Sequence, residues 1–225
     1  MGTDTGVGKT RVASRIARAL LTSGQNVGVY KPAASGCSLV DGELISDDAV
    51  ALWEAAGRPG DLAAVCPQRF KAPLAPHLAA RADGLEIDAS LLRNGLNHWL
   101  QRSEVVVVEG AGGLLSPLGD GEYVADLAVE FGLPLVLVAP NKIGVINQVL
   151  QTLMAAAYFS PALQFAGIVL NDVLPPGSDD PSISSNRREL EARCSVPLLA
   201  QLGYDATEFD RPIDWGSVAH GSGSN

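Results

Sequence analysis

The chain has 225 residues, of which 47% are hydrophobic, and its formal net charge is −9. This length and hydrophobic fraction suit one large α/β domain. The acidic balance, without any block of Lys or Arg, argues against nucleic acid as a partner, because nucleic acid requires a basic surface. The three cysteines are widely spaced, which suits packing roles in a reducing compartment.

The sequence contains no stretch of about 18 consecutive apolar residues, and its beginning lacks the basic and apolar regions of a signal peptide. We therefore expect a cytoplasmic protein with no membrane partner.

Five short apolar runs predict β-strands, and six amphipathic patterns predict helices. The runs are continuous rather than alternating, which is typical of parallel strands covered on both faces. Because strand and helix alternate, we expect a doubly wound α/β fold with a mainly parallel sheet. The predicted strands are 26–33, 104–113, 133–141, 165–172 and 196–203; the predicted helices are 9–23, 46–57, 88–102, 121–132, 144–159 and 184–194.

Polar residues stand where these predicted strands end. In such sheets ligands bind outside the carboxyl ends of the strands, and those positions hold Lys31, Glu109, Asn141 and Asn171. The region 1–205 is predicted to form one nucleotide-binding domain. From 206 to 225 the chain is polar and ends in Gly and Ser, so we expect a weakly ordered tail there.

The segment GTDTGVGKT near the N-terminus is a variant of the phosphate-loop pattern GxxxxGK[ST], with Thr3 where the pattern requires Gly. Gly6 and Gly8 let backbone N–H groups converge on a phosphate, Lys9 supplies an ammonium and Thr10 a hydroxyl for Mg²⁺. The predicted helix that follows adds the partial positive charge of its N-terminus. The alternative is a turn ahead of an ordinary helix.

Three other residues favour phosphate chemistry only in combination. Lys31 ends one strand and Glu109 another, and Asp48 opens a helix after Asp47; each alone fits a solvated charge, an ion-pair partner or a helix cap. Parallel strand ends lie on one edge of a sheet. Two lysines and a metal held by Thr10, Asp48 and Glu109 would neutralise a triphosphate and its transferring group.

The order of these motifs resembles that of the dethiobiotin synthetase family. The resemblance rests on GTDTGVGKT, KPAASG, SDDAVAL, APLAPHLAA, VEGAGGLLSPL, NKIGVIN and VLNDVLPPG, and covers positions 2 to about 203. It implies a fold of the P-loop NTPase type. It also implies ATP- and Mg²⁺-dependent carboxylation of 7,8-diaminononanoate by CO₂ with ring closure to dethiobiotin, in a homodimer with its active sites at the interface.

The resemblance also implies roles for individual residues. It makes Lys9 and Lys31 catalytic, and it makes Thr10, Asp48 and Glu109 the metal contacts. Substrate contacts would be Thr5, Ser35 and Asn147, the last at a helix N-terminus that holds a carboxylate. The implied nucleotide contacts are Gly6, Val7, Gly8, Lys9, Thr10, Arg11, Asp48, Glu109, Gly110, Ala111, Gly112, Asn171, Asp172, Gly203 and Tyr204, with Asn171 at the adenine.

The sequence departs from the family at three places. Gly203 and Tyr204 occupy a purine-specifying segment that usually contains a proline, and the tail has no recognisable counterpart. Family members carry a β-strand before the phosphate loop, whereas here only Met1 precedes it. Since that strand would lie inside the sheet, we expect the native protein to begin further upstream.

Three other functions fit parts of the pattern. A partitioning or switch ATPase shares the loop, but such proteins generally need a basic or membrane-seeking face. An amidoligase of the cobyrinate type would need an additional glutamine-handling domain, for which 225 residues leave no room. A truncated, non-catalytic member of the family would show neither ATP binding nor turnover.

Overall fold

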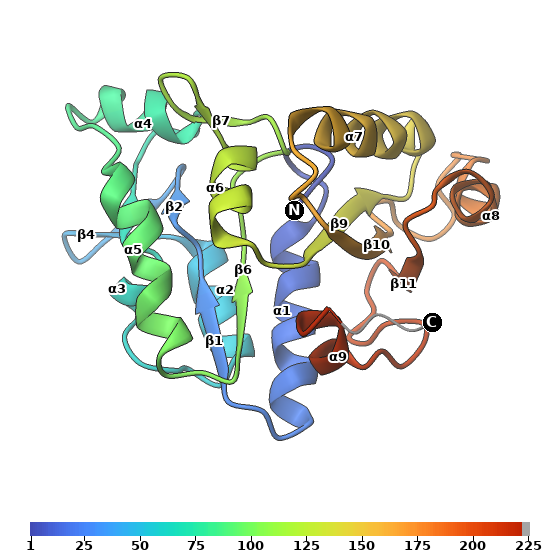
Figure 1. Cartoon of the computed structure of the whole chain (residues 1–225), viewed down its shortest axis with the longest axis horizontal. Coiled ribbons are helices and arrows are strands. Elements are labelled where there is room, and N and C mark those ends of the chain that lie inside the picture. The colour runs from blue at the N-terminus through green and yellow to red at the C-terminus, as the bar shows by residue number, and fades with distance from the viewer. Residues whose placement is uncertain (222–225) are drawn as a thin grey trace. The chain divides into compact units, whose positions relative to one another are not determined.

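The computed structural model describes residues 1–221 and has an α/β architecture (Figure 1). The described chain divides into two compact units. The first unit contains residues 1–12, 112–114 and those from 128 onward, and the second contains 13–111 and 115–127. Helices α1 (Lys9–Thr22) and α6 (Val124–Phe131) each have residues in both units.

The first unit is built around three parallel strands in the order β11-β10-β9. Helix α7 (Val145–Phe159) connects β9 (Leu135–Pro140) to β10 (Phe165–Asn171), and α8 (Ile183–Arg193) connects β10 to β11 (Leu198–Leu202). These strands and helices share one buried apolar cluster, in which each large side chain contributes about 1.5–3 kcal/mol. Its members are Leu137, Ala139, Val145, Val149, Ile168, Leu170, Leu190 and Leu198.

The first three residues pair with β9 as a strand would. The Met1 nitrogen donates to the Val136 carbonyl at 3.0 Å, Val138 N–H donates to the Met1 carbonyl at 2.8 Å, and Thr3 N–H donates to the Val138 carbonyl at 3.0 Å. Gly2 forms single parallel bridges with Val138 and with Gly113. This pairing fixes the start of the segment that forms the phosphate loop.

The second unit is built around β1 (Val27–Tyr30) and β6 (Val105–Val108), which pair in parallel. Its helices are α2 (Asp47–Ala55), α3 (Leu62–Val65), α4 (Pro76–Ala82) and α5 (Ala89–Leu100). Three short strand pairs complete it: β2 (Ala33–Ala34) with β5 (Gln68–Arg69), β3 (Ser38–Val40) with β4 (Glu43–Ile45), and β7 (Pro117–Gly119) with β8 (Glu122–Tyr123).

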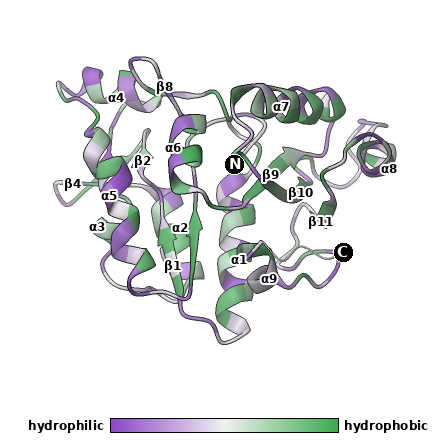
Figure 2. Ribbon diagram, viewed as in Figure 1, coloured by the Kyte–Doolittle hydropathy of each residue, from purple (hydrophilic) through white to green (hydrophobic). Residues whose placement is uncertain are grey.

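The five predicted strands and six predicted helices are confirmed, with ends displaced by a few residues. In the described part of the chain the main strands pair in parallel, as β1-β6 and as β11-β10-β9, which confirms the predicted α/β fold with mainly parallel strands. Helices α3, α4 and α9 (Trp215–Ala219) were missed because elements of four to seven residues show too little periodicity. Figure 2 shows hydrophobic residues along β1, β6, β9 and β10, as expected of covered strands.

The described part of the predicted tail contacts β11. Asp210 and Gln201 exchange backbone and side-chain hydrogen bonds, with Asp210 N–H donating to the Gln201 carbonyl at 3.0 Å and Gln201 N–H donating to Asp210 Oδ1 at 2.7 Å. Trp215 is buried and packs on Phe209. These contacts favour an ordered chain from β11 to α9. Residues 222–225 of the predicted tail lie outside the described residues.

None of the helices among residues 1–221 combines the length and the apolar character needed to cross a bilayer.

Candidate functional site

Lys31 and Glu109 leave two neighbouring strands at the same edge. Tyr30 at the end of β1 pairs with Val108 at the end of β6, so the next residue of each strand is Lys31 or Glu109. Glu109 N–H donates to the Tyr30 carbonyl at 2.9 Å, which extends the pairing by one residue. The two side chains are therefore brought together by strand register.

Two carboxylates hold the Lys31 ammonium. Lys31 Nζ lies 2.8 Å from Glu109 Oε1 and 2.9 Å from Asp48 Oδ2. The side chains of Lys31 and Glu109 are 5% and 3% exposed, whereas that of Asp48 is 50% exposed. Asp48 lies in the first turn of α2, whose N-cap is Ser46, so the cap role that the sequence left open for Asp48 falls to Ser46.

The charge of Lys31 is set by these neighbours. Burial acts to lower the pKa of its ammonium, but the carboxylates of Glu109 and Asp48 outweigh burial and raise that pKa above its ordinary value. Lys31 is thus a protonated cation throughout the physiological pH range, with one side of its ion-pair cluster open to solvent at Asp48.

Asp48 and Glu109 have the chemistry of a Mg²⁺ site. Their oxygens converge on one cation, the Lys31 ammonium, and carboxylate oxygens are the ligands that Mg²⁺ prefers. Within residues 1–221, no three His, Cys, Asp or Glu side chains are grouped to hold a metal. Two carboxylates fit an ion that also takes oxygens from water and from substrate phosphates.

The phosphate loop lies in the first unit. Gly6 and Gly8 have positive φ values of 73° and 87°, which the loop needs in order to turn its backbone. Val12 N–H donates to the Gly8 carbonyl, so the helical bonding of α1 begins at the loop. Lys9 Nζ donates to the Asp4 carbonyl at 2.8 Å, and Thr10 follows in the first turn of α1. Backbone amides, an ammonium and a hydroxyl are thus collected at one helix N-terminus.

Asn171 and Arg11 bond to one another beside this loop. Arg11 Nη1 donates to Asn171 Oδ1 at 2.7 Å, and Asn171 Nδ2 donates to the Val7 carbonyl at 3.0 Å. Arg11 Nη2 also donates to the carbonyls of Gly203 and Ala206. The loop, the end of β10 and the turn after β11 are thereby connected within one unit.

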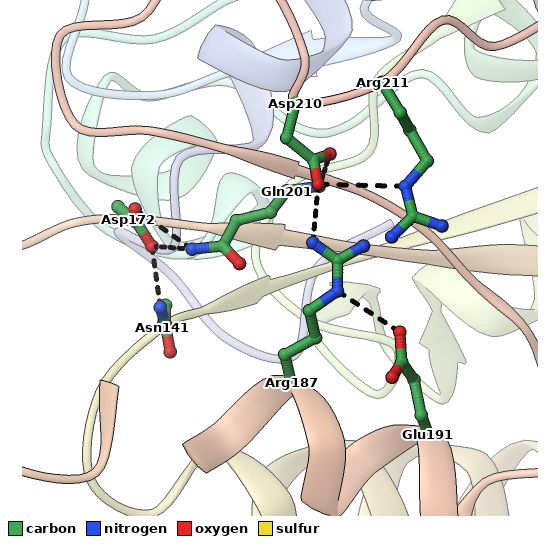
Figure 3. A network of polar contacts seen from close by, with 7 residues as sticks. All are labelled: Asn141, Asp172, Arg187, Glu191, Gln201, Asp210 and Arg211. Atoms are coloured by element: carbon green, nitrogen blue, oxygen red, sulfur yellow. Dashed lines mark hydrogen bonds and ion pairs between the residues drawn. The ribbon is translucent and has the colours of Figure 1, made fainter. Parts of the chain in front are cut away.

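Asp172 belongs to a polar network that joins the ends of the three strands (Figure 3). Its Oδ1 accepts from Asn141 Nδ2 at 2.7 Å and from Gln201 Nε2 at 2.9 Å. Gln201 bonds to Asp210, which forms an ion pair with Arg187 of α8 at 2.5 Å. The network connects β11 to the end of β10 and to α8.

The remaining predicted contacts are exposed or half-buried. Ser35 is exposed after β2, Asn147 is exposed in the first turn of α7, and Thr5 is exposed in the loop. Tyr204 is 40% exposed. The glycine-rich segment Gly110, Ala111 and Gly112 is half-buried directly after Glu109.

Sequence reasoning missed several partners of these residues. Nothing in the pattern marked the Asp4 carbonyl as the partner of Lys9, or Gln201 and Asp210 as the neighbours of Asp172. Asn141 was noted only as a strand-end residue. Its buried neighbour Asn186 in α8 donates to Asn141 Oδ1 at 3.0 Å, and a lone Asn in a helix carries no sequence signal for this contact.

A glycine-rich loop that opens a helix, together with an α/β fold of parallel strands, defines a P-loop nucleotide-binding protein. The family model described as "AAA domain" matches residues 1–207. Among solved structures, the signal recognition particle receptor FtsY from Elizabethkingia anophelis matches with a TM-score of 0.54 at 14% identity, over 98% of this chain and 62% of that one. This likeness concerns the fold alone.

Curated relatives define the family more narrowly. The ATP-dependent dethiobiotin synthetase BioD of Rhodopirellula baltica is 42% identical over 89% of this chain and 81% of its own length. The protein of the same name from Anaeromyxobacter dehalogenans is 42% identical over 96% and 94%, and that from Bacillus licheniformis is 39% identical over 88% and 81%. The chain belongs to the ATP-dependent dethiobiotin synthetase family.

Proposed function

We propose that this chain uses ATP to carboxylate 7,8-diaminononanoate with CO₂ and to close the ureido ring of dethiobiotin, releasing ADP and phosphate. Membership of the dethiobiotin synthetase family supports this function. The observation that carries it is the buried Lys31 ammonium between Asp48 and Glu109, because a buried cation with two converging carboxylates suits phosphoryl chemistry and has no evident packing role.

The chemistry proceeds in three steps. One amine of the substrate adds to CO₂ and loses a proton, giving a carbamate. A carbamate oxygen attacks the γ-phosphorus of ATP, the bond to the ADP oxygen breaks, and a mixed anhydride forms. The second amine then attacks the anhydride carbonyl, and phosphate leaves. Lys9 and Lys31 stabilise the negative charge that develops on the transferring group and on the anhydride.

Mg²⁺ is the metal that we assign to Asp48 and Glu109, whose oxygens converge on one cation. When bound, it supplies positive charge that neutralises the triphosphate. The residues themselves supply hard oxygen ligands, and Lys9 and Lys31 carry the remaining positive charge.

We also propose a homodimer that uses the outer face of α7. Ile143, just before the helix, is 75% exposed, and Met154 and Tyr158 are 72% and 97% exposed. Asn147, four residues after Ile143, lies on the same face in the first turn of α7. At this helix N-terminus its side chain suits contact with a substrate carboxylate. In sedimentation equilibrium, Tyr158→Glu should give a monomer, whereas the control Leu85→Glu, at a leucine that is 55% exposed outside α7, should leave the dimer intact.

The test of the proposed function is a turnover assay with diamine, bicarbonate and Mg·ATP, omitting each in turn. Dethiobiotin should form only in the complete mixture, and phosphate release should depend on the diamine. Hydrolysis of ATP at the same rate without diamine would instead indicate a switch ATPase.

A further inference from the structure

Arg11 has a set of contacts that its sequence position does not explain. It follows Thr10 in the first turn of α1, yet its guanidinium reaches three acceptors on other segments. Nη1 donates to Asn171 Oδ1 at 2.7 Å, and Nη2 donates to the carbonyls of Gly203 and Ala206, the latter at 3.2 Å. A side chain that only interacted with solvent would make none of these bonds.

The partner of Arg11, Asn171, acts in turn on the phosphate loop. Asn171 is 1% exposed, and its Nδ2 donates to the Val7 carbonyl at 3.0 Å. A guanidinium can only donate and a carbonyl can only accept, so the two bonds fix the orientation of the Asn171 amide. The amide lies directly against the loop, because a Cβ on Gly8 would come within 2.1 Å of Nδ2.

We propose that Arg11 is a positioning residue that acts through Asn171 to hold the phosphate loop at Val7 and Gly8 in its phosphate-binding conformation. This inference rests on the proposed function in that the loop binds ATP. A planar guanidinium suits the role, since its fork presents donors in fixed directions to the amide and to the turn at 203–206, whereas a lysine would offer one mobile charge.

The positioning role and adenine recognition by Asn171 make different predictions. If Asn171 served only to contact the base, its loss would weaken binding of adenine nucleotides alone. If Arg11 and Asn171 shape the loop, their loss weakens binding of any triphosphate, with or without a base. Inorganic tripolyphosphate with Mg²⁺ is therefore the probe that separates the two roles.

The experiment measures the dissociation constants of ATP and of tripolyphosphate by calorimetry, both with Mg²⁺, for the full chain. Arg11→Ala and Asn171→Ala should each weaken the binding of both ligands by a similar factor of about ten, which is the scale of one charge-assisted hydrogen bond. Arg11→Lys should give a smaller loss. The matched control is Arg18→Ala, because Arg18 is exposed on the same helix and donates to the Glu54 carbonyl at 3.0 Å.

A loss confined to ATP, with tripolyphosphate bound as in the wild type, would overturn the inference. So would Arg11→Ala binding both ligands normally. Should Arg11→Ala not fold, Asn171→Ala and Arg11→Lys carry the same comparison of the two ligands, with the smaller loss expected for Arg11→Lys. Binding is measured without turnover, so a wild-type chain that binds both ligands but makes no dethiobiotin would refute the proposed function and leave the Arg11 result decisive.

Discussion

Glu109 lies directly beside Lys31 because β1 and β6 end in register, and the two buried side chains meet at 2.8 Å between Oε1 and Nζ. Asp48 reaches the same ammonium from α2 at 2.9 Å. A buried charge of this kind is costly unless it is paired, and such pairs add little stability over apolar packing. We therefore propose a chemical role for the cluster, which the next predictions test.

Lys31→Ala should reduce kcat by at least about 100-fold, on the scale of losing one preorganised donor to the developing charge. The dissociation constant of ATP should change by less than about threefold, because an interaction made only in the transition state leaves ground-state binding intact. Single-turnover formation of dethiobiotin and calorimetric ATP binding measure the two quantities. Ordinary turnover by this variant would contradict the catalytic assignment of Lys31.

The ammonium of Lys31 occupies the point on which the carboxylates of Asp48 and Glu109 converge, so a divalent cation has to compete with it. Lys31→Ala should therefore bind Mn²⁺ more tightly than the wild type in the absence of nucleotide, by about tenfold. The loss of the free Mn²⁺ signal in electron paramagnetic resonance measures this affinity.

Glu109→Gln is the matched control for the Mn²⁺ experiment. It removes one carboxylate and keeps the shape of the side chain, so it should weaken Mn²⁺ binding where Lys31→Ala strengthens it. Equal Mn²⁺ affinity in the wild type and Lys31→Ala would show that the lysine and the metal do not share these ligands.

The phosphate loop allows a paired test of its glycines. Gly8→Ala should abolish measurable ATP binding, because φ is 87° and the new Cβ would lie 2.1 Å from Asn171 Nδ2. Gly6 also has a positive φ, 73°, but an added Cβ there meets nothing within 4 Å. Gly6→Ala should therefore cost only the backbone strain, about 1–2 kcal/mol, and retain weakened binding. Similar affinities for the two variants would contradict the close packing of Asn171 on Gly8.

Much of the fold follows from sequence because its signals are local. The run of four valines before Glu109 and the apolar segments at β9 and β10 predict covered parallel strands. All three form parallel strands, although in β6 only Val105 is fully buried and the other three valines are half-buried. The proximity of Lys31 and Glu109 could also be predicted from the sequence, because residues that follow parallel strands lie at one edge of the sheet. Strand ends therefore carried most of the information on the candidate site.

The sequence did not predict which side chains far apart in the chain bond to one another. Arg11 and Asn171 are 160 positions apart, and neither residue type marks the other as its partner. Short helices such as α9 form through a local N-cap and the burial of one side chain, Trp215. Hydrophobic periodicity does not predict such helices.

Stability at alkaline pH should depend on Cys66. Its thiol is fully buried and donates to the Gln68 carbonyl at 3.5 Å, and burial raises the pKa of the thiol to about 12. The unfolded chain loses this proton near the ordinary pKa of about 8.5. Between these values the unfolded state binds fewer protons than the native state, so the free energy of unfolding falls as pH rises, by up to about 1.4 kcal/mol per pH unit.

Urea unfolding from pH 7 to 10 measures this effect, with Cys66→Ala as the comparison. Both proteins should have a flat profile below about pH 8, and the wild type should then lose stability more steeply than the variant. Lys31 contributes equally to the stability of both proteins. Because the pKa of its ammonium is raised in the folded state, its contribution is complete at pH values below the ordinary pKa, and it is lost only as the pH rises toward the raised pKa. The difference between the slopes therefore isolates the thiol, and parallel profiles would mean that Cys66 ionises in the native state as readily as in the unfolded chain.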